Sequence, residues 1–357
     1  MTKMIKLSLA AAVAVSALTT SAAAGSLEDA VKDTTISGKA MIGYNYKKVR
    51  TVSTNQTEYD FDVTLTTKVN DTISFTSGIQ ADHEVAINSA QTTDANSKPN
   101  GQKITLTKLY FTAKTDYATV MIGKQKQPTP FLDDERGDGV VALIPAGPVT
   151  VAAGHFTGMN GGLNGEDISA LAVIGTAGPV NASLWYTKMA NTIDGYSLNV
   201  NGTAGPVKVD FTHSSSKLID AANTEAQTLT KLIVTSKVAD INLLAGYGMT
   251  NDTTLNGFGV DWEGVDAKTN FGIDQLSLDG LDDASAILVG ASMTFGKTTA
   301  GIKYLTVDVA TGSNKNEVDL DVAYAMSKNF SVTGLYSDTN NDGGDDTRME
   351  LSLNYKF

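Results

Sequence analysis

The stretch that decides the fold is the end of the chain, Thr347-Arg-Met-Glu-Leu-Ser-Leu-Asn-Tyr-Lys-Phe357. Apolar and polar side chains alternate along it, and the chain ends on an aromatic ring. The apolar set is Met349, Leu351, Leu353, Tyr355 and Phe357, and the polar set is Arg348, Glu350, Ser352, Asn354 and Lys356. Because successive side chains of a strand point to opposite faces, the pattern predicts a strand of a membrane barrel with a wet interior. The last strand of a soluble sandwich could show the same period.

The other end of the chain indicates export. Lys3 and Lys6 precede an apolar run over residues 7–18, and Ala22-Ala23-Ala24 then supplies the small side chains of a cleavage site. These features predict a signal peptide over residues 1–24, which leaves residues 25–357 as a single barrel domain. No later stretch reaches the ~18–20 apolar residues of a membrane-spanning helix, so a membrane form must cross with strands.

The composition narrows the functions open to the chain. The formal net charge of −12 becomes −14 without Lys3 and Lys6, which argues against a nucleic-acid partner because phosphate binding needs a positive surface. There is no cysteine, which removes disulfides and thiolate chemistry. A hydrophobic content of 41% is low for a helical membrane protein and ordinary for a barrel whose faces alternate.

Segments of period two continue from Ile36 to Phe357, with turn residues between them. There are eighteen, near 35–46, 57–69, 72–84, 102–115, 117–125, 139–145, 149–157, 167–176, 180–189, 195–203, 207–216, 226–238, 241–250, 285–295, 299–310, 317–326, 330–338 and 347–357. The predicted fold is therefore all-β, a transmembrane antiparallel β-barrel of eighteen strands, with sixteen as the alternative. A barrel of about 16–18 strands leaves an aqueous channel.

The connections between these segments predict which end of the barrel faces outward. Very short ones, such as Asn70-Asp71 and Ala239-Asp240, alternate with long polar ones at 85–101, 126–138, 158–166, 251–284 and 339–346. Outer-membrane barrels have short periplasmic turns and long external loops, whereas a soluble sandwich has no reason to sort its connections. The tetrapeptide Ala-Gly-Pro-Val occurs at three of the short connections, beginning at residues 146, 177 and 204. In such a turn Gly can adopt a positive φ, and the ring of Pro fixes its own φ.

Three motifs carry a likeness to a known family: residues 27–38 before the first strand, Gly123-Lys-Gln125 at the end of the fifth, and residues 134–139 after it. Together they resemble the major outer membrane porin family of Campylobacter and related bacteria. The resemblance implies a homotrimeric porin of eighteen strands, with its third external loop, near residues 124–139, folded into the lumen as an acidic constriction. It also implies that Phe357 is the signal read by the outer-membrane assembly machinery.

The loop near residues 124–139 is the candidate constriction. The ionisable residues of this loop that we assign to the pore are Lys124, Asp133, Asp134, Glu135, Arg136 and Asp138. Carboxylates at a narrow point of low effective dielectric concentrate cations and repel anions. The alternative is a solvated acidic loop on the outer surface. The same four acids could supply oxygen ligands to Ca²⁺, although their spacing matches no defined calcium loop.

Alternation also assigns charged residues to the lumen side of the strands. The predicted acids of an external vestibule are Glu58, Asp60, Asp62, Asp319 and Asp321, and Arg348 and Glu350 share a face of the last strand. Ordinary polar lining of a lumen is the alternative interpretation. The aromatic residues near strand ends, Trp185 and several tyrosines among them, predict girdles at the membrane interfaces.

Two further groups of residues, the acids of one long connection and the three histidines, are candidate sites. The connection 251–284 holds eight acids against Lys268 alone, which favours a solvated surface over entry into the mouth of the barrel. His83, His155 and His213 fall on outward phases of strands four apart, nearly 20 Å around the wall at ~4.8 Å per strand, so they form no common metal site. The pair His213-Ser214 points to opposite faces, which argues against a hydrolase.

These observations predict a passive porin of a Gram-negative outer membrane. It would contact lipid and lipopolysaccharide and admit small hydrophilic solutes and ions through a water-filled lumen, with a preference for cations and no enzymatic activity. The alternative is a substrate-specific channel with a defined solute-binding site, which aromatic residues along the lumen would favour.

Overall fold

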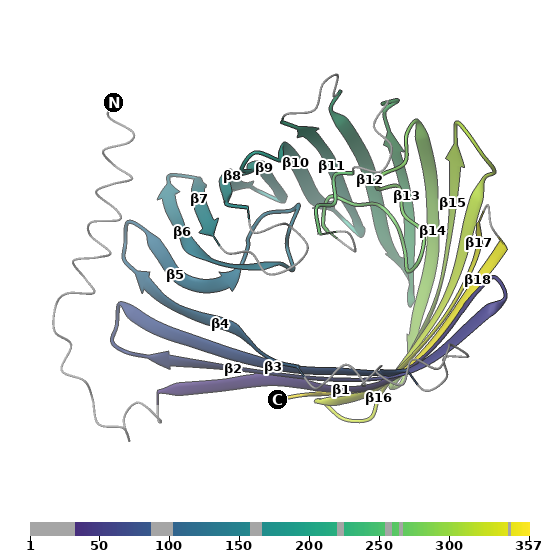
Figure 1. The fold of residues 1–357 in the computed structure, drawn as a ribbon, viewed down its shortest axis with the longest axis horizontal. Helices are drawn as coiled ribbons and strands as arrows, with labels where there is room; N and C mark the ends of the chain where they lie inside the picture. Colours follow the sequence, from purple (N-terminus) through teal and green to yellow (C-terminus); the bar gives the residue numbers. More distant parts are fainter. Residues whose placement is uncertain are drawn as a thin grey trace, which may run out of the picture.

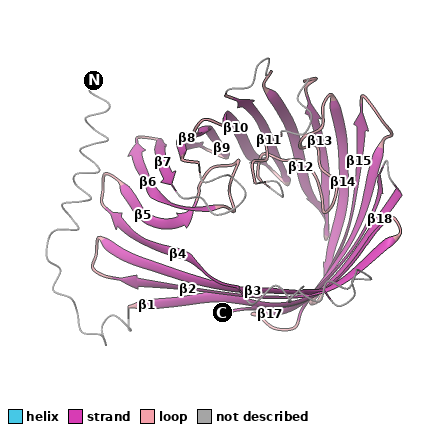
Figure 2. Ribbon diagram, viewed as in Figure 1, coloured by secondary structure: helices cyan, strands magenta, loops and turns pink. Residues whose placement is uncertain are grey.

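The structure, a computed structural model, describes residues 33–86, 103–157, 166–219, 225–253, 259–263, 267–341 and 344–357. The predicted signal peptide lies outside the described residues. Every regular element of the described part is a β-strand (Figure 2). No helix there has both the length and the apolar character to cross a membrane.

Eighteen antiparallel strands form one closed sheet (Figure 1), which confirms the predicted number and excludes the alternative of sixteen. Their bounds are β1 Thr34–Val49, β2 Val52–Lys68, β3 Ile73–Ala86, β4 Lys103–Lys114, β5 Thr119–Lys126, β6 Arg136–Ala146, β7 Val149–Thr157, β8 Ile168–Ala177, β9 Val180–Met189, β10 Ile193–Ala204, β11 Val207–Leu218, β12 Gln227–Val238, β13 Ile241–Thr250, β14 Ala284–Phe295, β15 Thr298–Val309, β16 Lys315–Ala325, β17 Phe330–Asn341 and β18 Gly344–Lys356.

The last strand closes the barrel against the first. β18 pairs with β1 from Lys39↔Lys356 to Val49↔Asp346. The ladder continues to the terminal residue, because the Gly38 amide donates to the Phe357 carbonyl at 2.9 Å and the Phe357 amide donates back at 3.1 Å. A closed sheet leaves no unpaired edge, which a membrane requires of any strand structure.

The two faces of the wall differ as the terminal strand predicts. Met349, Leu351, Leu353 and Tyr355 are exposed on the outer face, where a bilayer would cover them. Ser352, on the other face, is buried inside. The alternation is therefore apolar outward and polar inward along β18.

The short turns have the backbone that their sequence requires. Gly147, Gly178 and Gly205 have φ of +68°, +57° and +58°, as the first central position of a type II′ hairpin demands, and each precedes a proline. Two connections at the opposite end are also short, which the sorting of loop lengths did not predict. β1 and β2 pair up to Val49↔Val52, and β9 and β10 meet at Ile193↔Met189. Arg50 and Asn191 allow these tight connections by adopting φ of 56° and 55°.

Candidate functional site: the barrel lumen

A hairpin made by the ends of β5 and β6 leaves the wall and enters the lumen. We call residues 124–138 the inner hairpin. β5 and β6 stay paired as far as Lys126↔Arg136, whereas the pairing of β5 with β4 stops at Leu109↔Lys124. Gly123 and Gly139 face each other at the point of departure. A Cβ on either would overlap a backbone oxygen of the neighbouring strand, of Leu109 or His155, so glycine is required at this bend.

The tip of the inner hairpin is buried against a second inward segment. Phe131 and Leu132 are fully buried. The Phe131 ring stacks on Trp262, with ring centroids 4.5 Å apart and an interplanar angle of 22°. The Trp262 amide donates to the Phe131 carbonyl at 3.2 Å, and its indole Nε1 donates to Ser216 Oγ on β11 at 2.8 Å. The two segments therefore brace each other against the inner wall.

The second segment is the connection between β13 and β14, residues 251–283, which we call the lumen loop. Its described apolar residues pack inside the barrel rather than face solvent, so the preference for a solvated surface was wrong. The buried ones are Val260, Trp262, Ala267, Phe271, Leu276 and Leu278. All of these except Ala267 join inward apolar residues of β6 to β15, such as Phe156, Leu288 and Leu305, in one hydrophobic cluster. This cluster fills one side of the lumen.

The lumen loop also reaches the wall at β16 and β17, beyond β14 and β15. Its turn around Gln275 is held by Glu317 of β16, which accepts from the Gln275 amide at 2.8 Å and from the Leu276 amide at 2.6 Å. Gln275 Nε2 donates to Ser337 at 3.0 Å and to Thr339 at 3.1 Å on β17. We call these contacts the latch. Burial raises the pKa of the neighbouring Asp274, and the Arg348 guanidinium, which donates to it at 2.7 Å, opposes that shift.

Two polar cavities lined by described residues lie on the side of the barrel that the cluster does not fill. The larger, about 680 Å³, lies among β1 to β4, the C-terminus and the inner hairpin. Its charged lining residues are Lys39, Lys108, Lys126, Arg136 and Lys356, with Asp62 and Asp134 as the acids. The other, about 500 Å³, lies between the lumen loop and β1, β2, β17 and β18, and is lined by Lys47, Glu58, Asp274, Asp346 and Arg348 among others. We call the larger cavity the basic passage.

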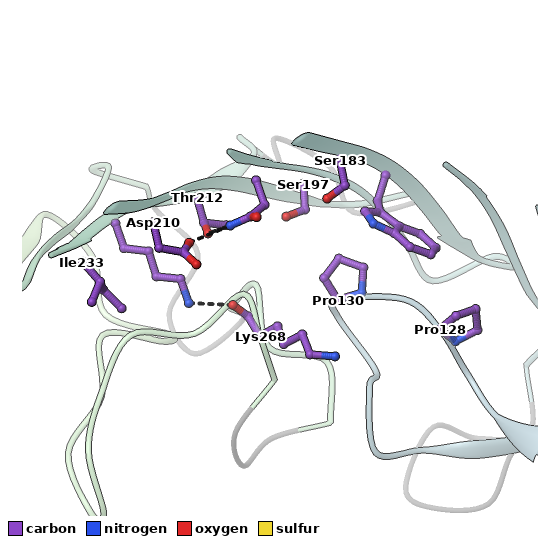
Figure 3. Close-up of a pocket in the computed structure, with 11 residues that line it drawn as sticks. Pro128, Pro130, Ser183, Ser197, Asp210, Thr212, Ile233 and Lys268 are labelled. Carbon is purple, nitrogen blue, oxygen red and sulfur yellow. Dashed lines mark hydrogen bonds between the residues drawn. The ribbon is translucent and has the colours of Figure 1, made fainter. Parts of the chain in front are cut away.

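A third cavity of about 420 Å³ lies on the far side of the inner hairpin, against β9 to β12 (Figure 3). Pro128 and Pro130 of the hairpin and Lys268 of the lumen loop face Ser183, Ser197, Asp210 and Thr212 across it. The inner hairpin thus separates this cavity, which we call the lateral pocket, from the basic passage.

Residues 9–346 match the sequence profile of the Gram-negative porin family. This chain belongs to that family. The porin is therefore an outer-membrane channel, and the predicted localisation in the bacterial outer membrane is confirmed. No curated protein sequence matches it.

Solved structures of outer-membrane porins share the fold of this porin. OccK8 (OprE) of Pseudomonas aeruginosa superposes with a TM-score of 0.74 at 16% identity, over 91% of this chain and 98% of that one. OpdK of Pseudomonas aeruginosa, solved with vanillate, has a TM-score of 0.77 at 10% identity, over 91% and 99%. OccAB4 of Acinetobacter baumannii has a TM-score of 0.74 at 12% identity, over 91% and 98%. At these identities the likeness establishes the fold alone.

The acids of the predicted constriction lie in the porin lumen, and the three aspartates lie next to three different lysines. Asp133 pairs with Lys268 at 3.0 Å, and Asp134 pairs with Lys126. Asp138 lies 3.9 Å from Lys124 at the base of the inner hairpin. Burial raises the pKa of Glu135. The four acids proposed for Ca²⁺ do not converge, and no group of three or more His, Asp or Glu able to hold a metal occurs among the described residues.

The predicted vestibule acids divide into two groups. Asp60 and Asp62 line the open side, where Asp60 pairs with Lys39 and accepts from Gln80 at 3.1 Å. Asp319 is buried, 1% exposed, so it does not face an open vestibule. Arg348 joins Glu350 at 3.0 Å and Asp274 at 2.7 Å, which makes it part of the latch side rather than an isolated cation.

Sequence reasoning missed three functional features of this porin. Glu317 was placed in a strand without a role, yet it is fully buried and holds the lumen loop. Trp185 was assigned to an interfacial girdle, but it lines the lateral pocket, because its neighbours Leu184 and Tyr186 take the outward phase. The lysines of the basic passage were not singled out. One sequence signal could have predicted the filled side of the lumen. Apolar residues occur in both phases of β6 to β15 and within residues 259–281, so some of them must face inward.

Proposed function

We propose that this porin is a passive channel for small hydrophilic solutes, and that solutes cross along the open side formed by β16 to β18 and β1 to β5. The supporting observation is the basic passage of about 680 Å³, whose lining is polar and whose opposite side is closed by the hydrophobic cluster. The inner hairpin and the lumen loop narrow the path to this side of the lumen. As long as both segments stay in place, they limit the size of the solutes that can cross.

The sign of selectivity that we propose is a preference for anions, opposite to the preference for cations predicted from the loop acids. The basic passage has five cationic residues against two acids. Asp134 and Lys126 neutralise each other, and Lys39 pairs with Asp60, which leaves Lys108, Arg136 and Lys356 against Asp62 in this lining. Asp133 lies outside the lining, beside Lys268. The Arg136 Nε is buried and has no hydrogen-bond partner among the described residues. A fixed positive lining within low-dielectric walls raises the local concentration of anions.

Planar-bilayer recording under a KCl gradient tests this proposal. We expect single-channel currents whose reversal potential has the sign for chloride crossing faster than potassium. The double variant Lys108→Gln with Arg136→Gln should move the reversal potential toward zero. Lys237→Gln, exposed near the end of β12 on the side that the hydrophobic cluster fills, should leave it unchanged. A cation preference in the parent porin would restore the original prediction, and the absence of any conductance would overturn the channel itself.

The alternative, a channel with a defined solute-binding site, receives support from the OpdK structure, which holds vanillate. A concave site with few polar groups inside the lumen would serve such a role here. Saturation of flux at rising solute concentration in a liposome-swelling assay distinguishes it from simple diffusion.

We also propose the homotrimer and the narrower relation to the Campylobacter porins. β5, β7, β8 and β9 have 8, 9, 10 and 10 residues, against 17 in β2. Strands that cross a bilayer need ~9–11 residues, so β5 falls short of this length and β7, β8 and β9 only just reach it. We place the neighbouring subunit against this lowest side of the wall. Native mass spectrometry in detergent tests the subunit number.

A further inference from the structure

The lateral pocket contains two lysines whose charges are already satisfied. Lys231 Nζ donates to the backbone carbonyls of Lys268 and Asn270, both at 2.6 Å. Lys268 Nζ pairs with Asp133 at 3.0 Å. The dashed line that ends on Lys268 in Figure 3 is the first of these hydrogen bonds. An anionic solute would therefore have to displace existing partners.

Other polar groups line the pocket and still have atoms free to form hydrogen bonds with a ligand. Asn199 Nδ2 donates to Asp210 Oδ1 at 2.7 Å and to Thr212 Oγ1 at 2.9 Å, which holds the Asp210 carboxylate in place. Within the described part of the chain, Asp210 Oδ2, the Ser183 hydroxyl and the Trp185 indole N–H make no hydrogen bond. One strong acceptor and two donors thus remain for a ligand.

The pocket walls add apolar surface to these groups. The Trp185 ring lies on β9, and Pro128 and Pro130 of the inner hairpin line the same cavity. Its volume of about 420 Å³ is within the ~300–1,000 Å³ typical of small-molecule sites. A flat aromatic side chain with a polar edge suits a ligand that has one apolar face and hydroxyl groups at its rim.

We propose that the lateral pocket binds a neutral sugar, a pyranose ring stacked on Trp185 with its hydroxyls bonded to Asp210 and Ser183. The C–H face of a pyranose matches the ring, and a hydroxyl donating to a carboxylate forms a charge-assisted hydrogen bond. With Lys268 paired to Asp133, Lys231 offsets the charge of Asp210, so the pocket has no net negative charge to attract a cation. The satisfied lysines disfavour an anion. This inference rests on the proposed channel function and gives the porin a second, uncharged class of solute beside the basic passage.

Tryptophan fluorescence tests the site directly, because the chain has only Trp185 and Trp262. Detergent-solubilised porin is titrated with maltose, and with benzoate and choline as an anion and a cation. We expect a saturable change in emission with maltose alone. The change should persist in Trp262→Phe, where Trp185 is the remaining fluorophore, and vanish in Trp185→Phe. A response only to benzoate or only to choline, or a maltose response that persists in Trp185→Phe, overturns the proposal.

Binding measured without fluorescence completes the test. In isothermal titration with maltose, Asp210→Asn should weaken affinity about tenfold, since a hydrogen bond to a charged acceptor is roughly twice as strong as a neutral one. Trp185→Ala should abolish binding, while Tyr186→Phe, one residue away on the outer face, should leave it unchanged. Bilayer conductance is recorded on the same preparations. Intact conductance without maltose binding refutes the sugar site alone, and lost conductance in the parent porin refutes the channel.

Discussion

At the scale of single residues, the bend of the inner hairpin depends on two glycines. Gly123 has a φ of +128°, and Gly139 lies opposite it at the point where β5 and β6 leave the wall. Both positions bring the backbone of a neighbouring strand so close that a Cβ would overlap a carbonyl oxygen. The absence of a side chain is what allows the strand pair to turn inward there.

Gly139→Ala is therefore expected to destabilise the folded barrel by roughly 1–3 kcal/mol, the usual cost of overpacking a tight contact. The temperature at which the folded band is lost on semi-native electrophoresis measures the effect. Gly334→Ala is the matched control, because a Cβ there would meet its nearest atom at 3.8 Å. Equal melting of the two variants would show that the bend tolerates a side chain.

Glu263 makes the contact between the two inward segments sensitive to pH. Its Oε2 accepts from the Asp134 amide at 3.0 Å, and burial, with Asp133, Asp261 and Asp134 nearby, raises its pKa to about 7. An acid whose pKa rises on folding binds more protons in the folded state between its ordinary value of 4.5 and about 7. The Asp134 hydrogen bond itself favours the ionised form, but burial outweighs it. The packing that buries Glu263 is therefore most stable at acidic pH and is destabilised as pH rises through that window.

We expect the lumen loop to be cleaved faster by added protease at about pH 8 than at about pH 5.5. Burial also raises the pKa of Asp279 in the same loop to about 6, which acts in the same direction. Glu263→Gln should remove most of the pH dependence because the amide stays neutral. Faster cleavage at the acidic pH would contradict this assignment. A denatured control substrate corrects for the pH dependence of the protease.

At the scale of elements, the lumen loop connects the inner hairpin to β16 and β17 inside the barrel. One side packs on the inner hairpin through Trp262 and Phe131, and its turn reaches β16 and β17 through the latch. Glu317 is the centre of the latch, since it accepts two backbone amides and the Ser337 hydroxyl at 2.7 Å. Loss of its carboxylate leaves buried donors without partners, at ~1–3 kcal/mol each.

Glu317→Ala should release the turn of the lumen loop and give larger, noisier single-channel currents than the parent porin. Asp321→Ala is the control, because Asp321 lies on the same face of β16 but outside the latch. Unchanged conductance and noise in Glu317→Ala would mean that the hydrophobic cluster alone holds the loop.

The terminal strand is the second element with a testable role. Phe357 exchanges two backbone hydrogen bonds with Gly38, and its ring lies 5.8 Å from Tyr355 and 6.3 Å from Phe61. Deleting Phe357 should lower the amount of folded protein in the outer membrane several-fold while export continues. Immunoblots of periplasmic and membrane fractions measure both quantities. Phe357→Tyr should restore assembly, and normal assembly of the deletion variant would contradict the role.

At the scale of the whole molecule, the barrel has two unlike sides. On the side of β6 to β15, inward apolar residues and the two inward segments form a core such as soluble proteins have. On the side of β16 to β18 and β1 to β5, the described lining is polar around two cavities. With no cysteine in the chain, the closed sheet and this internal core stabilise the fold without disulfides.

The sequence by itself determined the strands and their number, and in strands with clear alternation such as β18 also the face of each side chain, because alternation is a local property with a period of two. Trp185 on β9 shows where this failed, since apolar residues occupy both phases there. The sequence also determined the short turns, through Gly-Pro pairs that need no distant partner. Only the tertiary structure decided where the long connections go. The contacts of Phe131 with Trp262, of Gln275 with Glu317 and of Asp133 with Lys268 join residues far apart in the chain. Which charges are neutralised, and which side of the lumen stays open, follow from those long-range contacts.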